Sequence, residues 1–355
     1  MERQYWREYS QLEFEMQEKL KCASFFAGIG GIDIGFEGFG EKKSDTFEVV
    51  YANEIDPYVV RTYELNFPTK VDTRDIREVA ANPSSIPDFD VMLAGFPCQP
   101  FSIGGYRQGF NDERGRGTMF FELIKLIRAK QPRIIFLENV KNLVSHNDGD
   151  TFETILDALK QEGYGDAHWQ VMNAIEYGNM PQTRERIYIV AFKDKEARER
   201  FHMPSPVELT TKLGDIIDFD SQMPENLYYR KGQYKFCHHP SGCTGDVFEE
   251  LDREMDDPNT VYQWRRWYVR KNKSGAVPTL TANMGGGGHN VPVVRTKYGI
   301  RKLTVRECLN AQGFPKSYKM PEDLAPSRLY KQTGNSVCVG VVSRIASAIE
   351  VAIRE

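Results

Sequence analysis

Short apolar runs recur along residues 22–192 and predict buried strands that alternate with helices. These runs lack a clean alternation of apolar and polar positions, which is typical of strands covered on both faces. Strands that alternate with helices predict an α/β fold, with a mostly parallel sheet and helices on both of its faces. The predicted strands are Cys22–Phe26, Val49–Asn53, Val91–Ala94, Ile134–Glu138, Gln170–Asn173 and Arg186–Phe192.

Two helices are predicted between these strands. Met119–Ala129 carries apolar residues at helical spacing and stops before Pro132. Thr151–Gln161 is expected to begin with Thr151 as its cap, because a Thr side chain can accept a hydrogen bond from a free backbone N–H of the first turn.

The pattern changes after Pro206. From there to about residue 298 the chain is rich in Gly, Pro, Asn and aromatic residues and has no sustained helical period, which predicts a smaller irregular domain. Helical spacing returns at Thr304–Ala311 and Val339–Ile353, and we expect the second of these to pack onto the main sheet. The predicted organisation is an extension at 1–21, a first domain at 22–204 completed by 318–355, and a second domain at 205–317.

Composition is ordinary for a soluble globular protein, with 40% hydrophobic and 27% charged residues. No apolar run approaches the length of a membrane span, and residues 1–20 lack the apolar core of a signal peptide, so we expect a cytoplasmic protein with no membrane partner. Cys237, His238, His239 and Cys243 form a candidate metal cluster, but no second ligand pair follows at a familiar spacing, so no metal is expected.

The formal net charge of −4 argues against a nucleic-acid partner, which usually needs a basic excess. The charge is unevenly spread, however. Residues 262–306 hold ten Lys or Arg and no acid, which leaves −14 on the remainder of the chain. Although a charge run is usually only a solvated face, Trp264 and Trp267 are interleaved with these cations, a combination suited to nucleic-acid contacts. The preceding Asp246–Asp257 holds seven acids and one Arg, for which the sequence suggests no function.

A glycine-rich turn follows the first predicted strand. Gly28, Gly30 and Gly31 allow the backbone to turn sharply and approach a ligand, although Asp33 breaks the usual dinucleotide pattern. Glu54 follows the second strand, where an acid commonly accepts hydrogen bonds from ribose hydroxyls, and Asp75 follows at the expected place of a third strand end. Together they predict an adenosine-bearing cofactor, with a plain tight turn and two surface acids as the alternative.

Three further motifs carry candidate chemistry. Cys98 lies between Pro97 and Pro100 just after a strand, which is the setting of a positioned nucleophile rather than of a buried structural thiol. Glu138 closes a buried strand, where desolvation can raise its pKa and make it a proton donor, or it is simply a solvated acid. Arg184 and Arg186 enter another strand and can hold an anionic or carbonyl oxygen, or can serve as ordinary ion-pair partners.

The ordered motifs resemble those of DNA (cytosine-5) methyltransferases of the bacterial restriction–modification type. The likeness runs from about Ser24 to Ile349, with a gap over roughly 205–295. The matching blocks are FAGIGG, NEID, GFPCQPFS, ENV, QTRERIY, RKLTVRECLNAQGFP and GNSV. The resemblance implies a Rossmann-like domain that uses S-adenosyl-L-methionine, and a target-recognition domain that includes the basic segment.

By this resemblance, Cys98 adds to C6 of cytosine, Glu138 engages N3 and the exocyclic amine, and Arg186, with Arg184, engages O2. Two departures concern the cofactor, because many members carry an acid at the position of Ser24 and an aromatic residue at that of Ile55. The implied cofactor contacts are Phe26, Ala27, Gly28, Ile29, Gly30, Gly31, Glu54, Ile55, Asp75, Ile76, Pro97, Asn335 and Ser336.

The implied partner is double-stranded DNA, whose target cytosine must be extruded from the helix before its C5 can react. We expect a nucleoid-associated monomer that works alongside a restriction endonuclease. Thr279 and Leu280 resemble a Thr-Leu pair of the family's recognition region. A tRNA cytosine-5 methyltransferase shares the catalytic plan and is the main alternative. A nucleotide-binding oxidoreductase and a catalytically silent DNA-binding module are more distant ones.

Overall fold

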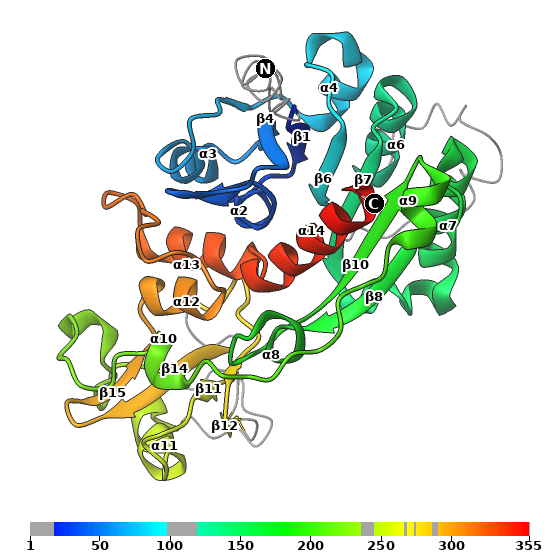
Figure 1. The fold of residues 1–355 in the computed structure, drawn as a ribbon. Helices are drawn as coiled ribbons and strands as arrows, with labels where there is room; N and C mark the ends of the chain where they lie inside the picture. Colours follow the sequence, from blue (N-terminus) through cyan, green and yellow to red (C-terminus); the bar gives the residue numbers. More distant parts are fainter. Residues whose placement is uncertain are drawn as a thin grey trace, which may run out of the picture.

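The computed structural model describes residues 18–97, 119–235, 245–265, 268–272, 275–285 and 290–354. Within these residues a seven-stranded sheet has the order β5-β4-β1-β6-β7-β10-β8 (Figure 1). Each predicted strand is present, so the expected mostly parallel α/β sheet is confirmed. The strands are β1 (Leu20–Phe25), β4 (Phe47–Asn53), β5 (Val71–Asp72), β6 (Val91–Gly95), β7 (Ile134–Val140), β8 (His168–Asn173) and β10 (Glu185–Phe192).

Helices cover both faces of this sheet, because successive strand residues point to opposite sides and nearly all of them are apolar. One face packs against α4 (Ile76–Ala81), α6 (Met119–Lys130) and α7 (Asp150–Leu159). The other packs against α2 (Gly31–Glu37), α8 (Ala174–Gly178), α9 (Lys195–Arg200) and α14 (Val339–Arg354). A small hairpin of β2 (Gly38–Phe39) and β3 (Lys42–Lys43) follows α2.

The predicted cap of α7 is wrong. The helix begins at Asp150 after Gly149, which has a φ of 96° and a backbone conformation that favours glycine. Thr151 lies inside the first turn, and its buried hydroxyl contacts Nδ1 of His146 at 2.7 Å.

Helix α14 crosses the front of the sheet and packs against α2, as expected from its apolar pattern (Figure 1). The contact is close, because a Cβ at Gly35 would lie 2.4 Å from Val342 Cγ1. Among the described residues, Pro326–Arg354 is the one helical stretch apolar enough to span a membrane, and 56% of its most apolar window is buried inside the fold. The burial of this stretch against the sheet identifies α14 as a core helix.

Strand β10 runs antiparallel to both of its neighbours, β7 and β8. Its first residues therefore lie beside the last residues of β7, with Arg186 paired to Val140 and Tyr188 paired to Glu138. Because β10 is antiparallel, its first residues lie at the sheet edge where β1, β4, β6 and β7 end.

The remaining lobe is more regular than predicted. It contains a four-stranded antiparallel sheet of order β12-β11-β14-β15, covered by α11 (Val247–Glu254) on one face and by α10 (Leu213–Ile216) and α12 (Val305–Ala311) on the other. Helix α13 (Pro326–Asn335) and the short pair of β9 (Gln182–Thr183) with β13 (Val277–Pro278) connect this lobe to the first. The strands are β11 (Tyr262–Trp264), β12 (Val269–Lys271), β14 (Val291–Thr296) and β15 (Gly299–Lys302).

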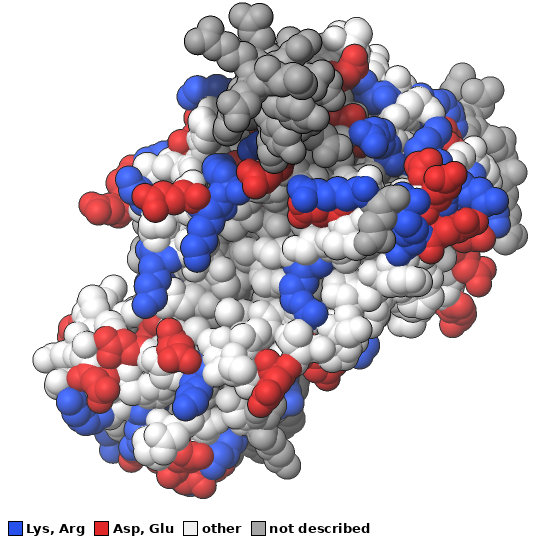
Figure 2. Space-filling model, in the orientation of Figure 1, with Lys and Arg blue, Asp and Glu red and all other residues white. Residues whose placement is uncertain are grey.

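The acidic segment Asp246–Asp257 forms α11 and its flanks, with Asp246 as the helix cap. Its acids form ion pairs with basic residues of the same lobe: Glu249 with Lys231, Asp252 with Arg295, and Asp256 with Lys271. Figure 2 accordingly shows Lys and Arg side chains interspersed with Asp and Glu over this lobe. Two cations of the basic segment 262–306, Lys271 and Arg295, are thus paired with acids of the same lobe.

A buried ion pair joins β15 to α12. Arg301 has no exposed surface and donates to both carboxylate oxygens of Glu307 at 2.8 and 2.9 Å. Glu307 also accepts from the backbone N–H groups of Thr304 and Asp218, so this one carboxylate holds a helix cap and an inter-segment contact.

We expect Arg301→Met to lower the free energy of unfolding by about 3 kcal/mol, because removal of one partner leaves the other charge buried and uncompensated. Urea unfolding followed by circular dichroism measures the effect. The matched control is Lys297→Met, since Lys297 is exposed in the β14–β15 turn. Equal stability of the two variants would contradict the structural role of the pair.

Candidate functional site

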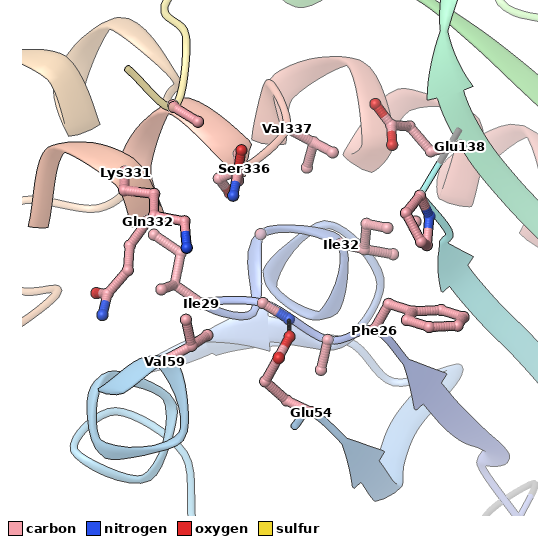
Figure 3. Close-up of a pocket in the computed structure, with 18 of the residues that line it drawn as sticks. Phe26, Ile29, Ile32, Glu54, Val59, Glu138, Lys331, Gln332, Ser336 and Val337 are labelled. Carbon is pink, nitrogen blue, oxygen red and sulfur yellow. Dashed lines mark hydrogen bonds between the residues drawn. The ribbon is translucent and has the colours of Figure 1, made fainter. Parts of the chain in front are cut away.

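A cavity of about 550 Å³ opens at the sheet edge where β1, β4, β6 and β7 end. Its opposite wall comes from α13, the residues that follow it, and the segment 280–282 (Figure 3). This volume is in the range of small-molecule and cofactor sites. Glu54 and Glu138 lie at opposite ends of the cavity, with the side chain of Ile32 between them and that of Ile29 beside Val59, on the side of Glu54 away from Glu138.

The glycine turn forms the floor of the cavity. Phe26, Gly28 and Gly30 have φ values of 54°, 57° and 77°, so the chain reverses tightly after β1. For Phe26 this left-handed conformation is strained, a feature that tends to occur at functional sites. A Cβ at Gly31 would lie 2.5 Å from Ser336 Oγ, so only glycine permits the segment after α13 to approach so closely.

Glu54 lies directly after β4 and is fixed by the backbone. One carboxylate oxygen accepts from Gly28 N–H at 3.1 Å and the other from Asp56 N–H at 2.9 Å. Burial raises the pKa of Glu54, and these two N–H groups oppose the rise. Each oxygen retains further acceptor capacity towards the cavity, which suits a ligand that carries hydroxyl groups.

Glu138 and Arg186 form an ion pair at the other end, with 3.1 Å between Glu138 Oε1 and Arg186 Nε. Burial raises the pKa of Glu138, whereas the charges of Arg186 and Arg184 lower it. The next residue, Asn139, donates to the carbonyl of Phe96 at 2.9 Å. Asn139 thereby holds the chain that leads to Pro97 and Cys98. Cys98 itself lies outside the described residues.

Arg184 is buried, and its side chain donates to main-chain carbonyls. It bonds Leu280 at 2.9 Å and Gly334 at 3.3 Å, and it also bonds the carbonyl of Ser336. Burial lowers the pKa of Arg184 to about 9, and the like charge of Arg186 adds to the effect. The guanidinium therefore joins β10 to two segments from distant parts of the chain.

Most of the residues predicted for the site line this cavity. Among the described residues, the exceptions are Gly30, Ile55, Asp75 and Ile76. Ile55 is 60% exposed, Ile76 is buried in the core, and Asp75 caps α4 and pairs with Arg77 at 2.7 Å. The predicted residues that do line it are Phe26, Ala27, Gly28, Ile29, Gly31, Glu54, Pro97, Glu138, Arg184, Arg186, Asn335 and Ser336.

Sequence reasoning missed one wall of the cavity. Helix α3 (Pro57–Glu64) and α13 form it together, and they are joined by Thr62, whose hydroxyl donates to Gln332 at 2.8 Å. Arg328 lies over the ring of Tyr58, 3.4 Å from its centroid. The apolar residues of α13 are too sparse to show a helical period in the sequence. The one available signal was Pro326, since proline suits the first turn of a helix. The lining residues from this wall are Asp56, Tyr58, Val59, Arg328, Lys331 and Gln332.

Residues 20–351 match a family model described as C-5 cytosine-specific DNA methylase. The chain is 50% identical over 330 residues to the Type II methyltransferase M.Bsp6I of Bacillus sp. (strain RFL6), and the match covers 93% of this chain and 98% of that protein. It is 37% identical over 340 residues to the Type II methyltransferase M.HhaI of Haemophilus parahaemolyticus, with 92% and 93% covered.

Solved structures share the fold. A DNMT2 variant from Spodoptera frugiperda has a TM-score of 0.67 at 20% identity, and the match covers 94% of this chain and all of that one. The methyltransferase EhMeth of Entamoeba histolytica has the same TM-score at 18% identity, with 96% of this chain covered.

Proposed function

The chain belongs to the C-5 cytosine-specific DNA methylase family, and we propose that it transfers a methyl group from S-adenosyl-L-methionine to C5 of cytosine in double-stranded DNA. It is thus a DNA cytosine-5 methyltransferase. One observation carries the proposal: the same cavity is lined by the glycine turn and Glu54 at one end and by the buried Glu138–Arg186 pair at the other.

The cavity suits an adenosyl cofactor. Glu54 offers fixed acceptors for two ribose hydroxyls, and Gly28 and Gly31 present backbone without side chains to the cavity. Ile29 and Val59 supply apolar surface beside Glu54 (Figure 3). When bound, S-adenosyl-L-methionine supplies a methyl group on a positively charged sulfur.

The groups around Glu138 would activate the cytosine. The Cys98 thiolate forms a bond to C6, and the electrons of the C5–C6 double bond make C5 nucleophilic while Glu138 donates a proton at N3. Arg186 holds O2 and also orients the Glu138 carboxyl. After C5 is methylated, a base removes its proton and the electron pair expels the thiolate, which restores the C5–C6 double bond. Water is our choice for that base.

Arg184 is better suited to positioning than to contact with the base. Its terminal nitrogens hold the carbonyls of Leu280, Gly334 and Ser336, and these segments close the cavity. It thereby fixes Asn335 and Ser336 beside the glycine turn. This assignment differs from the catalytic role that the resemblance implies for Arg184.

Access to cytosine requires extrusion of the base, and the phosphates need cations. Arg270 and Lys297 are exposed in the recognition lobe and form no ion pair with any described acid. They are therefore our candidates for phosphate contact. We infer a monomer that acts on chromosomal DNA, and by likeness to the Type II relatives we infer that it works beside a restriction endonuclease.

The direct test incubates the pure protein and S-adenosyl-L-methionine with unmethylated plasmid DNA and, in parallel, with unmodified tRNA. Bisulfite sequencing should show 5-methylcytosine at one recurring DNA sequence and none in tRNA. Methylation of tRNA alone would replace the proposal with its main alternative.

We expect Glu54→Gln to weaken cofactor binding by about 10–100-fold, because a charge-assisted acceptor is lost and the new amide faces a backbone N–H. The KM for S-adenosyl-L-methionine reports the change. Glu41→Gln is the matched control, since Glu41 is exposed in the β2–β3 turn. An unchanged KM in Glu54→Gln would exclude Glu54 as the ribose-binding residue.

A further inference from the structure

A buried carboxylate lies beneath the glycine turn. Asp33, on α2, has no exposed surface and pairs with no cation among the described residues. Its two oxygens accept hydrogen bonds from the hydroxyls of Ser24 at 2.5 Å and Tyr63 at 2.6 Å.

These two bonds reach both sides of the turn. Ser24 lies near the end of β1, two residues before the strained Phe26. Tyr63, on α3, stacks on Phe67 with 4.4 Å between ring centroids. The ring of Phe67 lies directly against Gly30, where a Cβ would come within 2.3 Å of it. The position of the turn therefore follows from the positions of Ser24 and Tyr63, which Asp33 joins.

The charge on Asp33 is costly to the fold. Burial raises its pKa from 3.8 to about 6, the nearby charge of Glu37 raises it further, and the two hydroxyls oppose the rise. Burial raises the pKa of both Cys22 and Tyr318, and the charge of Asp33 raises it further. For an acid whose pKa is raised by folding, stability falls as pH rises through the interval between its unfolded and folded pKa values. At pH 8 the ionised Asp33 therefore destabilises the fold, so stability alone does not explain its presence.

We propose that Asp33 is a positioning residue for cofactor binding, whose carboxylate holds the turn at Gly28–Gly31 in its binding conformation through Ser24 and Tyr63. This role rests on the proposed function, because it presumes that the turn binds an adenosyl cofactor. Protonation of Asp33 would convert one of its acceptors into a donor and would leave one hydroxyl without its present acceptor.

The test compares Asp33→Asn and Tyr63→Phe with the unaltered full chain. Tyr63→Phe removes one donor and keeps the ring on Phe67. Tyr164→Phe is the matched control, because Tyr164 is equally buried and its hydroxyl donates to Pro132 at 2.6 Å, remote from the cavity. Calorimetric titration with S-adenosylhomocysteine between pH 5 and 8 gives the Kd, and thermal unfolding gives Tm.

At pH 8 we expect a Kd about tenfold higher in Asp33→Asn and about fivefold higher in Tyr63→Phe, with no change in Tyr164→Phe. The Tm should be unchanged or higher in Asp33→Asn, and it should fall similarly in the two Tyr→Phe variants. On acidification, the affinity of the unaltered chain should decline through about pH 6, as Asp33 is protonated. In Tyr63→Phe this decline should occur at a higher pH, because a hydroxyl that lowers the pKa of Asp33 is lost. In Asp33→Asn the decline caused by Asp33 should be absent. Glu54 titrates in all of them, so the differences report Asp33.

Equal affinity of Tyr63→Phe and Tyr164→Phe, or the same pH dependence in Asp33→Asn and the unaltered chain, would overturn the role of Asp33 alone. A lower Tm in Asp33→Asn with unchanged Kd would assign it a purely structural role. Failure of the unaltered chain to bind S-adenosylhomocysteine would instead overturn the proposed function, and the role of Asp33 with it.

Discussion

Replacement of Cys98 by alanine is expected to abolish methyl transfer, with a loss of more than about 10⁴-fold in turnover. C5 of cytosine is too weak a nucleophile until a thiolate has added at C6, and no other group can substitute for that bond. Radioactive methyl incorporation into DNA measures the loss. Cys308→Ala is the control, because Cys308 is a thiol buried in the other lobe, away from the cavity.

The covalent step can be observed directly. When 5-fluorocytosine replaces the target base, its C5 substituent cannot leave as a proton, so the thiolate cannot be expelled. We expect a denaturant-stable protein–DNA complex that requires S-adenosyl-L-methionine and is absent in Cys98→Ala. Turnover of normal DNA without such a complex would rule out the thiolate mechanism.

Replacement of Glu138 by glutamine is expected to reduce turnover by about 10²–10⁴-fold, the range of general acid catalysis. The amide keeps the size of the side chain but cannot deliver a proton to N3. Burial raises the pKa of Glu138, so the protonated fraction, and with it the rate, should fall as pH rises through that pKa. Single-turnover rates across pH should lose this dependence in Glu138→Gln.

Glu185→Gln is the matched control for Glu138→Gln. Glu185 lies at the start of β10 next to Arg186, but its carboxylate pairs with Lys141 at the surface. It should retain normal turnover and pH dependence. Equal losses in both variants would mean that general negative charge near Arg186, rather than the buried acid, supports the reaction.

The strands were predictable because burial on both faces produces short apolar runs that local sequence alone reveals. The direction of β10 was not, since an apolar run carries no information about whether it pairs parallel or antiparallel. The prediction of Thr151 as the cap of α7 was wrong for a local reason. Gly149, in a left-handed conformation, is the cap, so the helix begins at Asp150, one residue before Thr151. Regularity in the second lobe was hidden by strands of two to six residues between Gly- and Pro-rich turns.

The candidate site, like the fold, was predictable only in part. Glu54 follows β4 and Glu138 lies near the end of β7, and the carboxyl ends of parallel strands meet at one edge of a sheet, so their meeting was predictable. The wall from α3 and α13 was not, because Thr62 and Gln332 are 270 residues apart and meet only through packing. Arg184 was identified as a site residue, but the carbonyls that it holds belong to segments whose positions the sequence does not determine.

The position of α14 also has a consequence for biosynthesis. During translation, α2 emerges from the ribosome some 300 residues before α14, the helix that covers it, and the last-made strand of the sheet, β10, emerges some 150 residues before α14. Until α14 is made, Gly35 has no partner and the glycine turn lacks the segment around Ser336 that closes over it. A nascent chain therefore cannot complete the cavity, and until α14 is made it exposes the apolar surface that this helix covers. Modification of DNA begins only after synthesis has passed α14.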